Sequence, residues 1–168
     1  WPGSEQVALT ETQKLRADDA AADDWFGISV AIADGVAIVG AKGDDDGGSW
    51  SGSAYIFARD ESGGGWSQVK KLTVSDVPED ASFGYSVAIT NNAAIVGAYS
   101  ASSAYIFAPD ENSGVWSQVA RLTGDDAASE TFGWSVAIAN NTAIIGANGE
   151  DSQTGYAYIF KKYVNTNG

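Results

Sequence analysis

The chain contains one heptapeptide three times, as Phe-Gly-Ile-Ser-Val-Ala-Ile at 26–32, Phe-Gly-Tyr-Ser-Val-Ala-Ile at 83–89 and Phe-Gly-Trp-Ser-Val-Ala-Ile at 132–138. Each copy is followed by a short polar turn and by an apolar run that ends in Gly-Ala. The copies therefore recur with a period near 50 residues. Short strands repeated at such a period are typical of propeller arrays. The repeat predicts an all-β protein made of β-propeller blades.

Each repeat has four segments that read as strands. They are an outer strand (9–15, 66–72, 116–122), the heptapeptide, the apolar run (36–41, 93–98, 142–147) and Ala-Tyr-Ile-Phe (54–57, 104–107, 157–160). Acidic loops precede each heptapeptide. The turns Asp34-Gly35, Asn91-Asn92 and Asn140-Asn141 favour hairpins, because these residues tolerate positive φ. We expect one domain over 1–168, with repeats at about 9–57, 66–107 and 116–160.

The outer strand of the first repeat lies at the start of the chain, and no fourth strand follows Phe160. Three blades are too few to close a ring, since propellers have about four to eight. We expect a homodimer in which two chains exchange Leu9–Leu15 head to tail and form a six-bladed ring. The alternatives are a fragment or subunit that needs other propeller blades, and an unusual monomer.

The composition limits the possible partners. Acidic residues outnumber basic ones by 22 to 9, and the net charge of −13 disfavours nucleic acid. The chain has no cysteine for disulfides and no histidine for general-base or zinc chemistry. It has no apolar run long enough to span a membrane. A start at Trp1 rather than Met indicates a processed chain or a cut fragment.

The order Phe-Gly-x-Ser-Val-Ala-Ile, Ala-Ile-Val-Gly-Ala, Ala-Tyr-Ile-Phe and Trp-Ser-Gln-Val resembles the FG-GAP repeat. That repeat forms the blades of the integrin α-subunit propeller and of many extracellular proteins. The proline of Gly-Ala-Pro is missing in all three copies. The resemblance would also imply a calcium loop between the first two strands of a blade. A two-residue turn stands there instead, too short to surround calcium.

A possible metal site lies in the loop after Gly-Ala. Asp44, Asp45 and Asp46 in the first repeat, and Glu150 and Asp151 in the third, offer the clustered oxygens that Ca²⁺ prefers. The second repeat has no carboxylate in this loop. The alternative is a solvated acidic loop without a metal.

Aromatic residues near the loops form a candidate ligand site. The candidates are Trp25, Trp50, Tyr85, Tyr99 and Trp134, with Asn148 as a polar neighbour. Exposed Trp and Tyr beside Asp and Asn can stack on sugar rings or act as protein hot spots. The alternative is packing between blades, which we expect for Trp66 and Trp116 because they recur in register. Trp50 has no counterpart and is expected to be exposed.

Catalytic motifs are absent from the sequence. There is no histidine, no Gly-x-Ser-x-Gly elbow and no phosphate-binding Gly-Lys loop. We expect an extracellular, non-enzymatic binding or adhesion module for a protein or glycan ligand. The alternatives are a structural subunit that links chains by strand exchange, and a fragment of a larger propeller protein.

Overall fold

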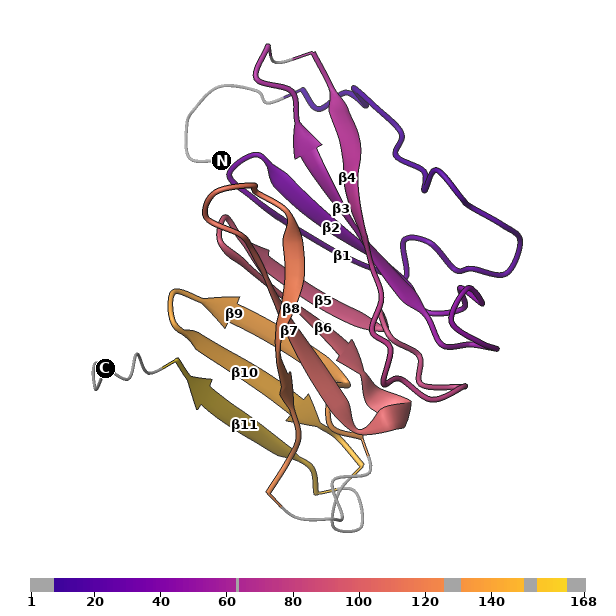
Figure 1. The fold of residues 1–168 in the computed structure, drawn as a ribbon, viewed down its shortest axis with the longest axis vertical. Helices are drawn as coiled ribbons and strands as arrows, with labels where there is room; N and C mark the ends of the chain where they lie inside the picture. Colours follow the sequence, from indigo (N-terminus) through magenta and orange to yellow (C-terminus); the bar gives the residue numbers. More distant parts are fainter. Residues whose placement is uncertain (1–7, 63, 126–130, 150–153, 163–168) are drawn as a thin grey trace.

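A computed structural model of the chain describes residues 8–62, 64–125, 131–149 and 154–162. These residues form three antiparallel sheets, which we call blades 1 to 3, and no α-helix (Figure 1). The strands are β1 Ser29–Ala33, β2 Val36–Ala41, β3 Ser53–Arg59 and β4 Trp66–Leu72 in blade 1; β5 Ser86–Thr90, β6 Ala93–Ala98, β7 Ser103–Pro109 and β8 Trp116–Leu122 in blade 2; and β9 Ser135–Ala139, β10 Thr142–Ala147 and β11 Tyr156–Lys161 in blade 3. The all-β prediction is confirmed.

Each blade is a meander in which every strand pairs with the next one along the chain. The predicted turns join the first two strands of each blade, with φ of 89° at Gly35 and 52° at Asn140. Blades 1 and 2 carry a bulge at the same place, between Ile56 and Phe57 and between Ile106 and Phe107. Their shared sequence therefore gives the same irregularity as well as the same strands.

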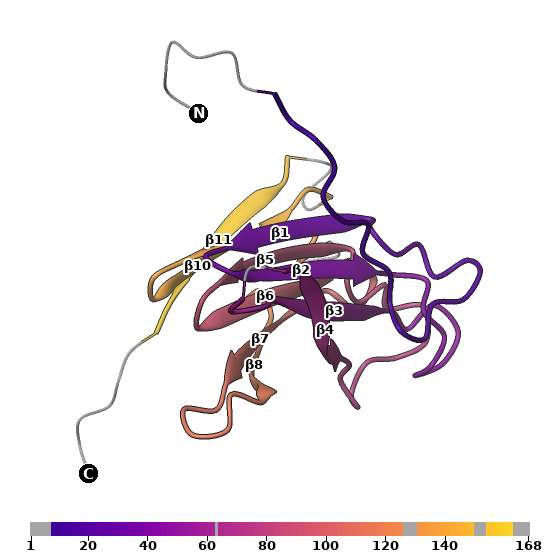
Figure 2. The same ribbon diagram turned by 90° about the horizontal axis from the view of Figure 1, so that it is seen from above.

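The blades pack face to face through their inner strands. β1 lies beside β5, and β5 lies beside β9, whereas the outer strands β4 and β8 fan apart (Figure 2). Phe83, Val87 and Ile89 of blade 2 enter one buried cluster with Ile38 and Ile56 of blade 1. The burial of such apolar surface is the main stabilising term. Trp116 belongs to this cluster and is 6% exposed, so packing is confirmed for this tryptophan.

A serine and two glycines fix the distance between neighbouring blades. The Ser29 hydroxyl donates to the carbonyl of Gly84 at 2.7 Å, and Ser86 donates to Gly133 at the same distance. A Cβ atom on Gly40 would clash with the Gly84 carbonyl, and one on Gly97 would clash with the Gly133 carbonyl. The repeated Phe-Gly, Ser and Gly-Ala are therefore the parts of one contact, made twice.

In the single chain residues 8–17 form no strand, and the pairing of Leu9–Leu15 with a second chain stays a prediction. This segment runs along blade 1, where the side-chain amide of Gln13 donates to the carbonyl of Trp66 and accepts from its N–H, at 2.8 and 2.7 Å. By its position in the repeat, this segment would pair with β11, the edge strand of blade 3. That edge lies at the far end of the stack (Figure 1).

Substituting Gly97 tests the blade contact. Gly97→Ala should lower the free energy of unfolding by about 1–3 kcal/mol, because the new methyl group overpacks the contact with blade 3. Gly64→Ala is the control in an open loop and should change it by less than about 0.5 kcal/mol. Denaturant unfolding measures both, and equal values would argue against the close approach of the blades.

Candidate functional site

Five aromatic side chains from all three blades gather at one end of the sheets. We call Trp25, Trp50, Tyr85, Tyr99 and Trp134 the aromatic strip. Tyr85 and Trp134 follow the Phe-Gly pairs that lead into β5 and β9, and Tyr99 follows β6. Because the inner strand begins where the second strand ends, the repeat brings these positions together across neighbouring blades.

The rings of the aromatic strip contact one another in two groups. The centroid of Tyr85 lies 4.4 Å from that of Tyr99 and 5.0 Å from that of Trp134, and Trp25 lies 6.3 Å from Trp50. The exposed fractions are 52% for Trp25, 38% for Trp50 and 36% for Trp134. Trp50 is exposed as predicted. The rings therefore support each other, and three of them stay partly exposed.

Lys42 joins the two groups of rings. Its ammonium lies 4.6 Å from the ring centroid of Trp25, 5.7 Å from that of Trp50 and 5.6 Å from that of Tyr85. Such cation–π contacts hold rings and cation in a fixed arrangement. Lys42 follows β2 as Tyr99 follows β6, and sequence reasoning missed it, because a single lysine after Gly-Ala carries no signal of its own.

The other candidate residues lie in blade 3. Asn148 is exposed directly after β10, at the position that Lys42 and Tyr99 occupy in blades 1 and 2. Glu150 and Asp151 lie outside the described residues.

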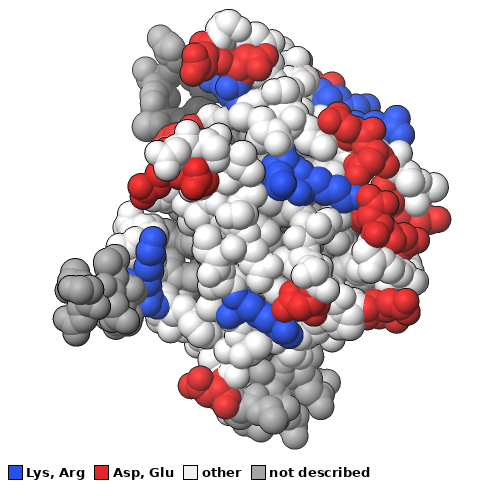
Figure 3. All heavy atoms as spheres, viewed as in Figure 1, with Lys and Arg blue, Asp and Glu red and all other residues white. Residues whose placement is uncertain are grey.

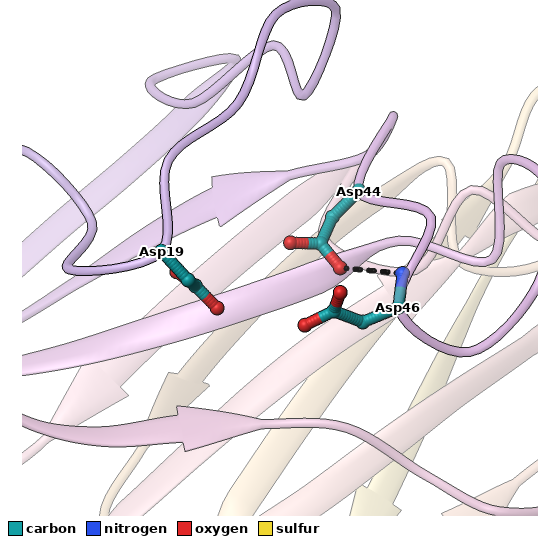
Figure 4. A group of neighbouring side chains, drawn as sticks. All are labelled: Asp19, Asp44 and Asp46. Atoms are coloured by element: carbon teal, nitrogen blue, oxygen red, sulfur yellow. Dashed lines mark hydrogen bonds between the residues drawn. The ribbon is translucent and has the colours of Figure 1, made fainter.

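Asp44 and Asp46 in the acidic loop after β2 lie close to Asp19 from the loop before β1 (Figure 4), and Lys71 contacts all three. The ammonium of Lys71 on β4 donates to Asp19 at 2.7 Å, to Asp44 at 2.9 Å and also to Asp46. Asp44 is buried, and it further accepts from the hydroxyl of Ser53 at 3.0 Å and from that of Tyr55 at 2.7 Å. Asp45 lies outside this group and accepts from the N–H of Trp50.

The cluster shifts the pKa values of its members. Burial alone would raise the pKa of Asp44, but the hydrogen bonds from Lys71 and Tyr55 outweigh it and lower that pKa. The pKa of Asp19 is lowered by the same balance, with Lys71 as its main donor. Burial would lower the pKa of Lys71, and the three carboxylates raise it instead. All three groups therefore stay charged at neutral pH.

The ammonium of Lys71 stands where a metal ion would have to bind. Asp19, Asp44 and Asp46 each offer one oxygen within 4.8 Å of the others, yet Lys71 already contacts all three. The residues therefore fit calcium only if Lys71 moves away. Calcium binding stays a prediction with that condition attached.

Blade 2 has a reduced form of the same cluster. Arg121 takes the position of Lys71, donates to Asp76 at 3.2 Å and contacts the hydroxyl of Ser103. Ala101 stands where blade 1 has Asp44, so the buried hydroxyl of Tyr105 has no hydrogen-bond partner among the described residues. The recurring basic residue before the last leucine of the outer strand was the sequence signal for Lys71 and Arg121.

A second candidate site is an apolar cleft at the other end of the sheets. It has a volume of about 410 Å³ and lies between blades 2 and 3. Ile106, Val119 and Leu122 line one side, and Ile138 and Phe160 line the other. Sequence reasoning did not find this cleft, because it forms where strands of two different repeats meet.

Charged residues are unevenly placed on the surface. Figure 3 shows acidic side chains gathered along the margin where the loops of blade 1 lie, and basic side chains scattered over the rest of this face. The described residues contain no helix with the length and apolar character needed to cross a membrane.

The repeated four-stranded blades with this loop end define a propeller-type repeat protein. FG-GAP repeats match residues 9–57, 66–114 and 116–160, and the chain therefore belongs to the FG-GAP repeat family. Among solved structures, the chain is similar to Saccharomyces cerevisiae Sqt1, with 14% identity and a TM-score of 0.49. The match covers 84% of this chain and 37% of Sqt1. No curated protein matches.

The two buried tyrosines give a matched test of the cluster. Tyr55→Phe should lower the free energy of unfolding by about 1–3 kcal/mol, because the buried Asp44 loses a donor. Tyr105→Phe removes a hydroxyl that has no partner among the described residues, and should be nearly neutral. Chemical denaturation measures both, and a larger cost for Tyr105→Phe would contradict this assignment.

Replacing Lys71 should change how the free energy of unfolding depends on pH. The lowered pKa values of Asp19 and Asp44 stabilise the wild type above pH 3.8, and this contribution is lost as the pH falls through their folded pKa values. Lys71→Met should destabilise the protein by about 3 kcal/mol at pH 7, since Asp44 then stays charged without its partner. The difference from the wild type should shrink as the pH falls below 3.8, where the wild type loses this contribution.

Melting curves at several pH values check this, with Lys70→Met on the same strand as the control. Added Ca²⁺ should raise the melting temperature of the Lys71→Met variant and leave the wild type unchanged. A rise in the wild type would mean that calcium binds without removing Lys71.

Proposed function

We propose that this chain is an extracellular, non-enzymatic binding module that holds a glycan on the aromatic strip. The observation that carries the proposal is the convergence of five aromatic side chains from three repeats at one end of the blades. A rigid stack of blades that carries its loops at one end is suited to binding. The FG-GAP repeat is a blade unit of extracellular proteins.

The chemistry of the strip favours a neutral sugar. Trp25, Trp50 and Trp134 are partly exposed, and such rings can stack on the apolar side of a pyranose. Asp45 is exposed, accepts from the backbone N–H of Trp50, and can also accept hydrogen bonds from sugar hydroxyls. The net charge of −13 would repel an acidic glycan. A row of partly exposed aromatic rings with polar neighbours suits an oligosaccharide.

A glycan array with the wild type tests the proposal, followed by titration of the strongest hit. Trp134→Ala should weaken that binding by about 30-fold, the effect of losing one hot-spot residue worth about 2 kcal/mol. Trp134→Phe should restore much of it, and Val119→Ala at the opposite end of the blades should have no effect. An array without hits would overturn the proposal of a glycan ligand, and so would binding of the Trp134→Ala variant as tight as that of the wild type. Binding of a protein that is weakened by Trp134→Ala would indicate a protein ligand instead.

A second candidate function is assembly, in which chains are linked through the segment Leu9–Leu15. Two observations favour it. Blade 3 has three strands within the described residues, so β11 is its outer edge. The segment that would supply a fourth strand lies unpaired on blade 1. An edge strand of this kind is a ready template for pairing with another chain.

A further inference from the structure

Blade 1 has one face that no other blade covers, which we call the leading face. Val30 and Ile32 on this face are 68% and 69% exposed. Their equivalents in blade 2, Val87 and Ile89, are 9% and 7% exposed because blade 1 covers them. The leading face is therefore a blade-packing surface with its partner blade missing.

Blade 3 has the opposite uncovered face, which we call the trailing face. Ile144 is 42% exposed and Ile159 is 72% exposed. Their equivalents in blade 1, Ile38 and Ile56, are fully buried against blade 2. The trailing face thus has the sequence of a surface that receives the leading face of a following blade.

The serine–glycine contact is complete at two blade junctions and open at the two outer faces. Ser135 and Gly146 repeat the arrangement of Ser29 and Gly40, but the three atoms nearest to a Cβ atom on Gly146 all belong to Ser135 and none to another blade. On the leading face, a Cβ atom on Gly27 would meet nothing within 4 Å. Gly27 has the same left-handed φ, 94°, as Gly84 with its 90°. Each outer face therefore carries its half of the contact preformed.

The cleft between blades 2 and 3 marks the place of a missing side chain. Its lining includes Ile106, Leu122, Ile138 and Phe160. Their equivalents one repeat earlier, Ile56, Leu72, Ile89 and Phe107, lie in the buried cluster that contains Trp116, the first residue of β8. By position in the repeat, Leu9 corresponds to Trp116. Leu9 is 72% exposed in the single chain.

We infer that a second copy of this chain docks head to tail, its leading face on the trailing face of the first. Leu9–Leu15 of the second copy then becomes the fourth strand of blade 3 beside β11, and Leu9 enters the cleft. The Ser135 hydroxyl donates to the carbonyl of Gly27 in the second copy, as Ser29 donates to Gly84. This inference rests on the second candidate function and is independent of glycan binding.

The numbers of blades and faces favour a second copy over other occupants. One copy carries both a leading and a trailing face, and two copies joined by both pairs of faces form a closed ring with two-fold symmetry. Such a ring has six blades, within the usual four to eight. In the single chain, Leu9–Leu15 lies against blade 1, at the other end of the stack from β11 (Figure 1).

Light scattering after size exclusion gives the first test. The wild type should have twice the mass of the 168-residue chain. The double variant Ser135→Ala/Gly146→Ala should be monomeric, because the methyl group at position 146 fills the space that the Gly27 carbonyl of the second copy needs. The Ser135→Ala change removes the hydroxyl with which this methyl group would clash inside the chain. Leu9→Asp should raise the dissociation constant at least about tenfold, since it places a charge in the cleft. Val115→Asp, at an exposed apolar residue away from the two docking faces, is the control and should dimerise as the wild type does.

Engineered cysteines give the second test, since the chain has none of its own. In blade 2, Ala108 pairs with Ser117, and the equivalent pair is Lys161 with Thr10 of the other copy. Thr10→Cys/Lys161→Cys should oxidise to a covalent dimer, and Thr10→Cys/Val115→Cys should not.

Three outcomes would overturn the closed dimer. They are a monomer at all concentrations, a disulfide within one chain, and a ladder of open polymers. If Leu9→Asp breaks the dimer and Ser135→Ala/Gly146→Ala does not, strand exchange stands and the docking of the faces is overturned. Folding of each variant is checked by its circular dichroism.

Discussion

The contact between one blade and the next depends on a serine hydroxyl and a glycine carbonyl. Ser29 and Ser86 hold the backbone of the following blade at 2.7 Å, and Gly40 and Gly97 leave room for it. This close approach lets Val87 and Ile89 reach the buried face of blade 1. The aromatic strip follows from it, because rings from different repeats meet only when the blades are this close.

Much of the fold could be predicted from the sequence, because its determinants are local and repeated. Alternating apolar residues define the strands, and turns such as Asp34-Gly35 define the hairpins. Leu9–Leu15 was the exception: its sequence is compatible with a strand, but a strand also requires a partner edge. No pattern within seven residues reports where that edge lies.

The candidate site was predictable only in part. The exposed aromatic residues could be named from their places beside the repeated motifs, since the repeat fixes which positions share one end of the blades. The cluster at Asp44 could not be predicted from the sequence. Its central cation, Lys71, comes from a strand 27 residues away, and Asp19 comes from another loop. Sequence patterns show clustered charge, whereas the fold decides which opposite charge meets it.

The cluster at Lys71 has a consequence for the conditions in which blade 1 stays folded. The cation that pairs with Asp19, Asp44 and Asp46 is part of the chain, so it cannot diffuse away when the surrounding solution is diluted. A bound ion would make the blade sensitive to the mineral content of its medium. Because the ammonium of Lys71 is covalently part of the chain, the stability of this loop does not depend on dissolved metal ions while Lys71 stays in place.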